Sequence, residues 1–226
     1  MRHWKKYKAA VELVDSEKKY PLEEAVSLVK KVSYTKFDWT VEIHIQTNAN
    51  PKYNDQNLRW TVVLPHGTGK KVVVAAFVSD DKIEDAKKAW ADIAGNVELM
   101  ADITKWDIKF DVLVTSPDMM RDLAKAAKIL WPKWLMPSPK AGTVTPKISE
   151  TINEIKKWRV EFKLDKSGVI HTWIGKVSFD EKSLAENTQS LVNAMNAAKP
   201  TGVKWALISK VYIAPSMWPS VQVAIS

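Results

Sequence analysis

The sequence predicts an α/β protein with two domains, and three observations support that fold class. First, the chain has 226 residues, 46% of them hydrophobic and 27% charged, which suits one sizeable core or two modest ones. Second, strand and helix patterns alternate in the middle of the chain, from residue 68 to residue 158. Third, residues 1–67 and 159–226 share a different sequence pattern, which predicts strands with one polar face together with amphipathic helices.

The first 67 residues are expected to form two helices and two strands. Residues 5–14 have a helical pattern, and residues 20–31 have a clearer one, with a proline suited to the first turn, acids at the start and lysines at the end. Residues 40–46 alternate between polar and β-branched side chains, which predicts a strand with one polar face. Residues 59–64 follow a turn-rich segment and are typical of a second strand.

The middle segment predicts a mostly parallel, Rossmann-like sheet covered on both faces, because its strands are continuous apolar runs separated by helices. The expected elements are 71–78, 82–89, 92–94, 97–104, 110–115 and 117–130, strand and helix in turn, with a further helix at 149–157. Between the last two helices, prolines at 132, 137 and 139 exclude a helix or a central strand over most of residues 129–144. That stretch is expected to be an ordered loop.

The last third resembles the first in style. Strands are expected at 159–164, 169–174, 206–214 and 219–225, around one helix at 179–197. The simplest organisation is a discontinuous α+β domain of residues 1–67 and 159–226, into which a three-layer α/β domain of residues 68–158 is inserted. The chain would then cross between domains near residues 67–71 and 156–159, and two adjacent crossings form a natural hinge.

Composition excludes several classes of protein. The absence of cysteine excludes disulfides and thiolate metal sites, and the four histidines lack ligand-like spacing, so neither a metal nor a cofactor is expected. The longest purely apolar run, residues 72–78, is about a third of a membrane-spanning helix, and no signal-peptide pattern is present. We therefore expect a cytoplasmic protein that does not enter a membrane.

The charge balance favours a polyanionic partner. The formal net charge is +8 and the isoelectric point is near 9.4. Residues 1–67 and 159–226 together hold 19 lysines and arginines against 13 acidic residues, which is +6 of the +8.

No catalytic motif is recognisable. The segment from Gly67 to Lys71 (GTGKK) resembles a phosphate-binding loop, but leucine occupies position 64, where the motif needs a glycine, and Lys71 replaces the hydroxyl that would bind magnesium. A domain crossover is the stronger interpretation of this segment. Because no nucleophile or general base has a catalytic context, we do not expect an enzyme. A cytosolic nucleotide- or metabolite-binding α/β protein is the alternative, supported only by the style of the middle domain.

One group of side chains could form a binding surface for RNA. If both chain ends share a sheet, these side chains would converge on one edge, and structured RNA is read by such a mixture of cations, hydroxyls, amides and apolar contacts. A turn or sheet-packing role accounts equally well for any one of them taken alone. The group comprises Lys36, Phe37, Thr40, Glu42, His44, Asp165, Lys166, Ser167, Gly168, His171, Gly175, Lys176, Ser216, Met217, Trp218 and Pro219.

Several motifs, in order along essentially the whole chain, resemble the ribosomal protein L-one family, the protein of the mobile side stalk of the large ribosomal subunit. They are NDQNLR at 54–59, LPHG at 64–67, FDVLVTSPD at 110–118, the segment 130–144, and the residues 170–171 and 174–176. The resemblance implies a two-domain protein, a monomer outside the ribosome, that binds a stem-junction of large-subunit rRNA. It also implies that the protein helps to move deacylated tRNA out of the exit site and, as in many bacterial members, represses its own mRNA.

The RNA contacts of that family lie chiefly in the domain made of both termini. Carried over residue by residue, they fall on Lys36, Phe37, Thr40, Glu42, Asp165, Lys166, His171, Lys176, Ser216 and Met217, with Trp218 beside them.

Tryptophan is the one strong departure from the family pattern. The chain has 11 tryptophans and only 7 glycines, whereas usage of about 7% gives roughly 16 glycines. Glycine permits positive φ and close backbone approach, and tryptophan does neither. Our hypothesis is that a codon read as glycine in the source organism is written here as tryptophan. The family pattern has glycine where this chain has tryptophan at positions 4, 60, 90, 106, 131, 134, 158, 205 and 218.

Overall fold

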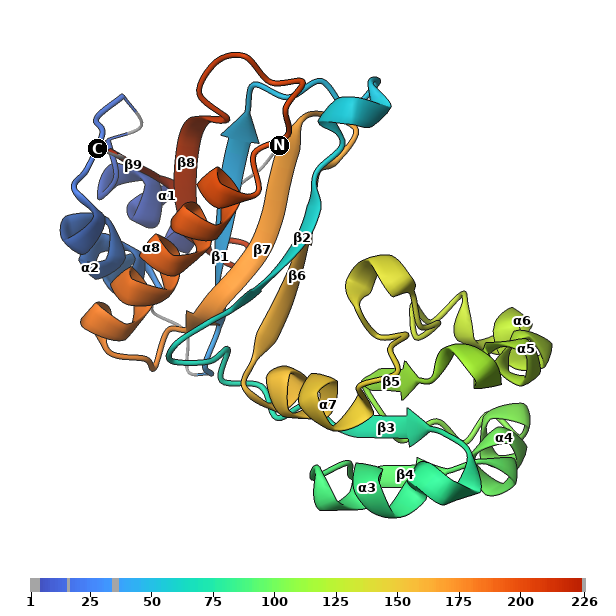
Figure 1. Cartoon of the computed structure of the whole chain (residues 1–226). Coiled ribbons are helices and arrows are strands. Elements are labelled where there is room, and N and C mark those ends of the chain that lie inside the picture. The colour runs from blue at the N-terminus through green and yellow to red at the C-terminus, as the bar shows by residue number, and fades with distance from the viewer. Residues whose placement is uncertain (1–4, 16, 34–36, 225–226) are drawn as a thin grey trace. The chain divides into compact units, whose positions relative to one another are not determined.

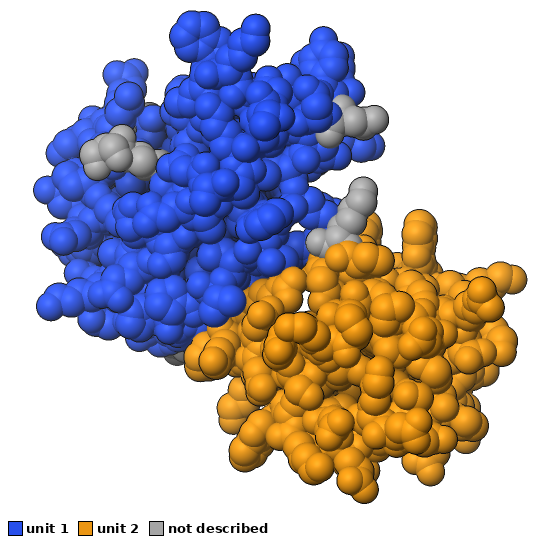
Figure 2. Space-filling view, in the orientation of Figure 1, with its two compact units in different colours: residues 1–69, 160–226 blue, residues 70–159 orange. Residues whose placement is uncertain are grey.

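A computed structural model describes residues 5–15, 17–33 and 37–224 of the chain (Figure 1). Helices and strands are mixed throughout, so the α/β fold class predicted from the sequence is confirmed. The chain divides into two compact units, residues 1–69 with 160–226 (unit 1) and residues 70–159 (unit 2), which Figure 2 distinguishes by colour. The domain boundaries expected from the sequence lie within two residues of these divisions.

Unit 1 is built on a four-stranded antiparallel sheet with the strand order β7-β1-β8-β9. Its first segment also contains the helices α1 and α2, and its second contains the long helix α8. The strands are β1 (Thr40–Thr47), β7 (Val169–Lys176), β8 (Ile208–Pro215) and β9 (Val221–Val223), and the helices are α1 (Lys5–Glu12), α2 (Leu22–Val32) and α8 (Glu181–Ala197). A second, two-stranded sheet pairs β2 (Arg59–Val63) with β6 (Arg159–Lys163).

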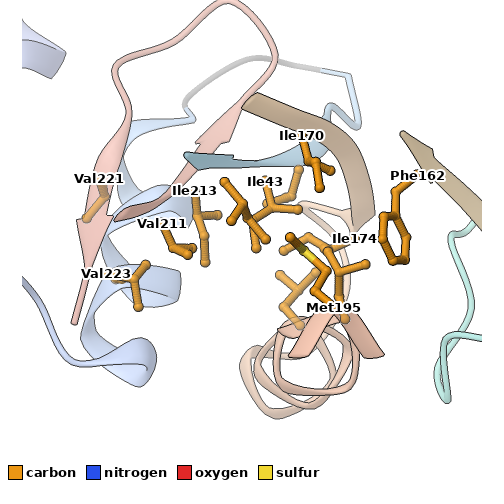
Figure 3. Close-up of a cluster of buried hydrophobic side chains, with 14 of the residues drawn as sticks. Ile43, Phe162, Ile170, Ile174, Met195, Val211, Ile213, Val221 and Val223 are labelled. Carbon is orange, nitrogen blue, oxygen red and sulfur yellow. The ribbon is translucent and has the colours of Figure 1, made fainter. Parts of the chain in front are cut away.

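The core of unit 1 lies between the four-stranded sheet and the helices α2 and α8. Alternate residues of each strand are buried because side chains on a strand alternate between its two faces. Ile43 of β1, Ile170 of β7 and Ile213 of β8 lie on the side of the sheet that faces Met195 of α8 (Figure 3), and Leu191 of α8 belongs to the same buried cluster. The register pairs Ile43 with Ile213, and Thr40 with Lys176 at the end of the sheet.

Unit 2 has three layers. Its parallel sheet has the order β4-β3-β5, from β3 (Val74–Phe77), β4 (Ile93–Gly95) and β5 (Val112–Thr115). One face of the sheet packs on α3 (Ile83–Lys88) and α7 (Ile148–Lys156), through Ala76, Ile152 and their neighbours. The other face packs on α4 (Val97–Thr104) and on the helical turns of residues 117–130, through Phe77 and Leu123.

Two sequence-based element predictions in unit 2 were wrong in detail. The single helix expected at 117–130 is divided into 3₁₀ turns at Pro117–Met119 and Ala124–Ala126 and short helices α5 (Met120–Leu123) and α6 (Ala127–Leu130). Leu123, Ala126 and Leu130 are all buried against the core of unit 2, so the buried face continues through the segment although its hydrogen bonds change from one turn to the next. The strand expected from residue 71 begins at Val74, because the Val73 carbonyl accepts from the amides of both Asp111 and Val112.

Within the described residues, no helix is long and apolar enough to cross a membrane, and no three histidines or acids are grouped closely enough to hold a metal ion.

Candidate nucleic-acid interface

One face of the four-stranded sheet carries polar side chains and is not covered by α2 or α8. Directly paired residues of antiparallel strands share a face, and His44 of β1 pairs with His171 of β7 and Tyr212 of β8. The side chains of this face are either exposed or half-buried. We call it the open face, and it comprises Thr40, Glu42, His44, Gln46, His171, Trp173, Lys210 and Tyr212.

Four predicted site residues are joined at the Thr40 end of the sheet. The Lys176 ammonium donates to the Thr40 hydroxyl at 3.0 Å. The Ser216 amide donates to the Thr40 carbonyl at 3.0 Å, and the Ser216 hydroxyl donates to the Glu42 carboxylate. These bonds link β1, β7 and the end of β8. A cation, a hydroxyl and a carboxylate are therefore held in fixed positions at this end of the sheet.

Met217 lies at the tip of a turn next to this group. The Trp218 amide donates to the Pro215 carbonyl at 3.0 Å, which closes a four-residue turn, and Met217 has a φ of 70° at its third position. Positive φ is strained for methionine, and strain of this kind is concentrated at functional sites. The Met217 side chain is 86% exposed, whereas Trp218 packs on the core of unit 1.

Phe37 occupies the segment that leads into β1. Its ring is 64% exposed and lies 4.6 Å from the ring of Trp39. Between them, the Asp38 carboxylate accepts from the amide and the hydroxyl of Ser178, at 3.0 and 2.8 Å. Asp38 therefore anchors the Phe37 segment beside the end of β7. Lys36 lies outside the described residues.

The middle of the open face contains a histidine pair. The Nδ1 atoms of His44 and His171 are 2.8 Å apart, so one ring donates and the other accepts. Burial lowers the pKa of His44, the neighbouring His171 lowers it further, and Glu42, 3.8 Å away, acts in the opposite direction. One hydrogen therefore lies between the two Nδ1 atoms.

Asp165 and Lys166 lie at the other end of the sheet. They belong to the turn between β6 and β7, in which the Gly168 amide donates to the Asp165 carbonyl, and Thr47 donates to the Gly168 carbonyl at 2.7 Å. Thr40 and Thr47 are the two ends of β1, separated by about 23 Å at the usual rise of a strand. The expectation that all the candidate residues meet at one edge is therefore wrong for Asp165 and Lys166. The structure instead distributes them along an elongated face.

Sequence reasoning missed four side chains that belong to this surface. One is Trp173, which was assigned only to the strand expected at 169–174. Asp38 was not singled out, although it orders Phe37. Lys210 and Tyr212 were assigned only to a strand, because their position opposite Gln46 and His44 depends on the pairing of β1 with β8. Lys210 also borders a hollow of about 490 Å³ whose lining includes Lys19 and Lys199.

The lysine of the glycine-rich crossover, Lys70, pairs with an acidic residue of unit 2. The Lys70 ammonium is bound to the Asp111 carboxylate at 2.9 Å, and that carboxylate also accepts from the Val73 amide. Both bonds hold the pKa of Asp111 below its usual range, opposed by burial. Lys70 is therefore engaged in holding the start of unit 2 together.

Comparisons with known proteins give a consistent result. The family model for the "Ribosomal protein L1p/L10e family" matches residues 29–219. The curated "Large ribosomal subunit protein uL1" of Thermosipho africanus is 46% identical over 223 residues, covering 98% of this chain and 96% of the relative. The proteins of the same name from Kosmotoga olearia and Onion yellows phytoplasma are each 45% identical, and they cover 96% and 99% of this chain and 94% and 97% of their own lengths.

Proposed function

The chain belongs to the ribosomal protein L1p/L10e family, and we propose that it acts as an rRNA-binding structural protein at the mobile side stalk of the large ribosomal subunit. In this role it is a cytoplasmic, non-enzymatic component of the subunit, assists release of exit-site tRNA and represses translation of its own mRNA. Outside the ribosome it is a monomer. The similarity over nearly the full length of several large-subunit proteins carries the proposal.

The open face supports an RNA ligand in particular. At its Thr40 end, the open face is bordered by Lys176, by the hydroxyl of Ser216 and by two exposed apolar side chains, Phe37 and Met217. Recognition of structured RNA uses phosphate and 2′-hydroxyl contacts together with stacking on apolar groups, and this end offers both kinds. An elongated face with further polar groups at Asp165 and Lys166 suits a ligand that extends along the sheet.

A nucleotide- or metabolite-binding function has less support. Its only support was the alternation of strands and helices in the middle domain. The lysine of the glycine-rich segment before that domain, Lys70, pairs with Asp111. Fold style alone is weak evidence for activity.

Filter binding to the side-stalk rRNA fragment tests the proposed site. Met217→Ala removes an exposed side chain that would become buried against RNA, so we expect the Kd to rise about tenfold, equivalent to about 1.4 kcal/mol. Phe37→Ala should weaken binding to a similar extent. Val97→Ala is the matched control, because Val97 is also an exposed apolar residue, 76% accessible, but lies on unit 2. Unchanged affinity in both site variants would reject the site, and affinity that is insensitive to salt would reject an RNA-backbone ligand.

A further inference from the structure

Four tryptophans have backbone conformations that tryptophan rarely adopts. Their φ angles are 68° at Trp90, 66° at Trp106, 59° at Trp134 and 60° at Trp158. Met217 is the one other non-glycine residue with positive φ in the described part of the chain. The left-handed region places Cβ close to the backbone, so it is occupied mainly by glycine and, less often, by asparagine or aspartate.

The hydrogen bonds around these residues explain why their φ is positive. After α3, the Trp90 amide donates to the Lys87 carbonyl and the Ala91 amide to the Ala86 carbonyl. This pair of bonds is the Schellman motif, in which the chain reverses out of a helix through one left-handed residue that is usually glycine.

The same motif recurs at two further helical ends, and half of it at a fourth. After α4, the Trp106 amide donates to the Ile103 carbonyl and the Asp107 amide to the Asp102 carbonyl. After α6, the Trp134 amide donates to the Trp131 carbonyl and the Leu135 amide to the Leu130 carbonyl. After α7, the Trp158 amide donates to the Ile155 carbonyl. Four separate helical ends thus need a left-handed residue, and each has tryptophan there.

The four indole rings contribute little buried surface to the fold. The exposed fractions are 77% for Trp90, 60% for Trp106, 86% for Trp134 and 42% for Trp158. A tryptophan usually stabilises a protein by burying a large ring, whereas the rings of Trp90, Trp106 and Trp134 remain mostly in water and only Trp158 is about half-buried. Neither the backbone nor the packing accounts for tryptophan at these positions.

We infer that positions 90, 106, 134 and 158 carry glycine in the protein made by its own cell, because one codon written as tryptophan is read there as glycine. This inference rests on backbone geometry and is independent of the proposed function. It strengthens the family-based hypothesis at these four positions only. Trp60, Trp131, Trp205 and Trp218 have no positive φ, so glycine at those positions rests on the family pattern alone.

A surface of exposed aromatic rings is the competing explanation. Indole rings can stack on nucleic-acid bases, and the Lys133 ammonium lies 5.5 Å from the centre of the Trp106 ring. That explanation requires the tryptophans to be present in the native protein, whereas our inference requires them to be absent.

Peptide mass spectrometry of the protein purified from its own cells separates the two explanations. Trypsin should release residues 89–105, 106–109 and 134–140 as separate peptides, each with one of the positions in question. We expect the masses that contain glycine at 90, 106 and 134. A tryptophan mass at any of the three overturns the inference.

A thermal melt of the protein with the written sequence tests the conformational argument itself. Trp90→Gly should raise the Tm by about 2–4 °C, because it removes one strained left-handed residue from a chain of this length. Trp173→Gly is the control, since Trp173 is an exposed residue within β7, where glycine weakens the strand and should lower the Tm. If Trp90→Gly lowers the Tm as the control does, position 90 does not require glycine and the inference fails.

Discussion

At the scale of single residues, His44 on the open face makes the stability of the protein depend on pH. Tyr212 of β8 lies opposite His44, Lys210 lies two residues before Tyr212 on the same strand, and Glu42 lies two residues before His44 on β1. The pKa of His44 is lowered from its ordinary value of 6.5, chiefly by burial and then by His171. The unfolded chain therefore binds more protons than the folded chain between the two pKa values.

This difference predicts that stability falls as the pH is lowered. The contribution of His44 is complete above about pH 6.5 and is lost as the pH falls toward its lower folded-state pKa, with a slope of at most about 1.4 kcal/mol per pH unit. Thermal melts between pH 8 and pH 5 should show a steeper decline in Tm for the original protein than for His44→Gln. His171→Gln should flatten the curve less, because it removes only the smaller of the two causes and leaves His44 buried. Parallel curves for all three proteins would contradict this assignment.

At the scale of elements, α8 is tied to the sheet by a buried asparagine. Asn187 is fully buried, and its side-chain amide donates to the carbonyls of Gly67 and Ile174 at 2.9 and 2.8 Å. Its side-chain oxygen accepts from the His66 amide at 3.1 Å. One side chain thus joins the helix, strand β7 and the segment that leaves β2.

Asn187→Ala should destabilise unit 1 by about 2–4 kcal/mol, because it leaves buried carbonyls without a donor. The free energy of unfolding in urea, followed by circular dichroism, measures this loss. Asn193→Ala is the matched control on the same helix, since Asn193 is exposed and should change stability by less than about 0.5 kcal/mol. A loss below about 1 kcal/mol for Asn187→Ala would mean that water replaces the amide.

The elements differ in how much of them could be predicted from the sequence. β1 was predicted to within one residue, because polar and β-branched residues alternate strictly from Thr40 to Thr47. The division of residues 117–130 could not be predicted, since it depends on which residues reach the core of unit 2. The end of α4 at Thr104 was predicted, although tryptophan at position 106 replaced the glycine that normally marks such an end.

The candidate site was predictable residue by residue but not as an arrangement. Glu42 and Ser216 were both named, yet only the pairing of β1 with β8 shows that they are bonded. Asp165 and Lys166 were named with them, but they lie in the turn at the opposite end of β1. Strand order and register decide which turns share an edge, and neither can be read from local sequence patterns.

At the scale of the whole molecule, net charge does not distinguish the two units. With the boundaries that the structure gives, unit 1 has 18 lysines and arginines against 13 acids, and unit 2 has 16 against 13. The excess is therefore nearly proportional to length, partly because Arg159 falls in unit 2, where it pairs with Glu154. The case for unit 1 as the RNA-binding part must rest on its open face.

Unit 1 by itself should therefore bind the side-stalk rRNA about as tightly as the full chain. Its core cluster contains residues of unit 1 alone, and the pairing of β2 with β6 brings together the two segments that lead to and from unit 2. A chain in which a short glycine–serine linker replaces residues 70–159 should fold and retain an affinity within about threefold of the full chain. Because RNA binding releases counterions in proportion to the phosphates contacted, the slope of log K against log salt should also be unchanged. Met217→Ala in this shortened chain should weaken binding as it does in the full chain. A shallower salt slope, or an affinity loss greater than about tenfold in a shortened chain that melts cooperatively, would show that unit 2 supplies phosphate contacts of its own.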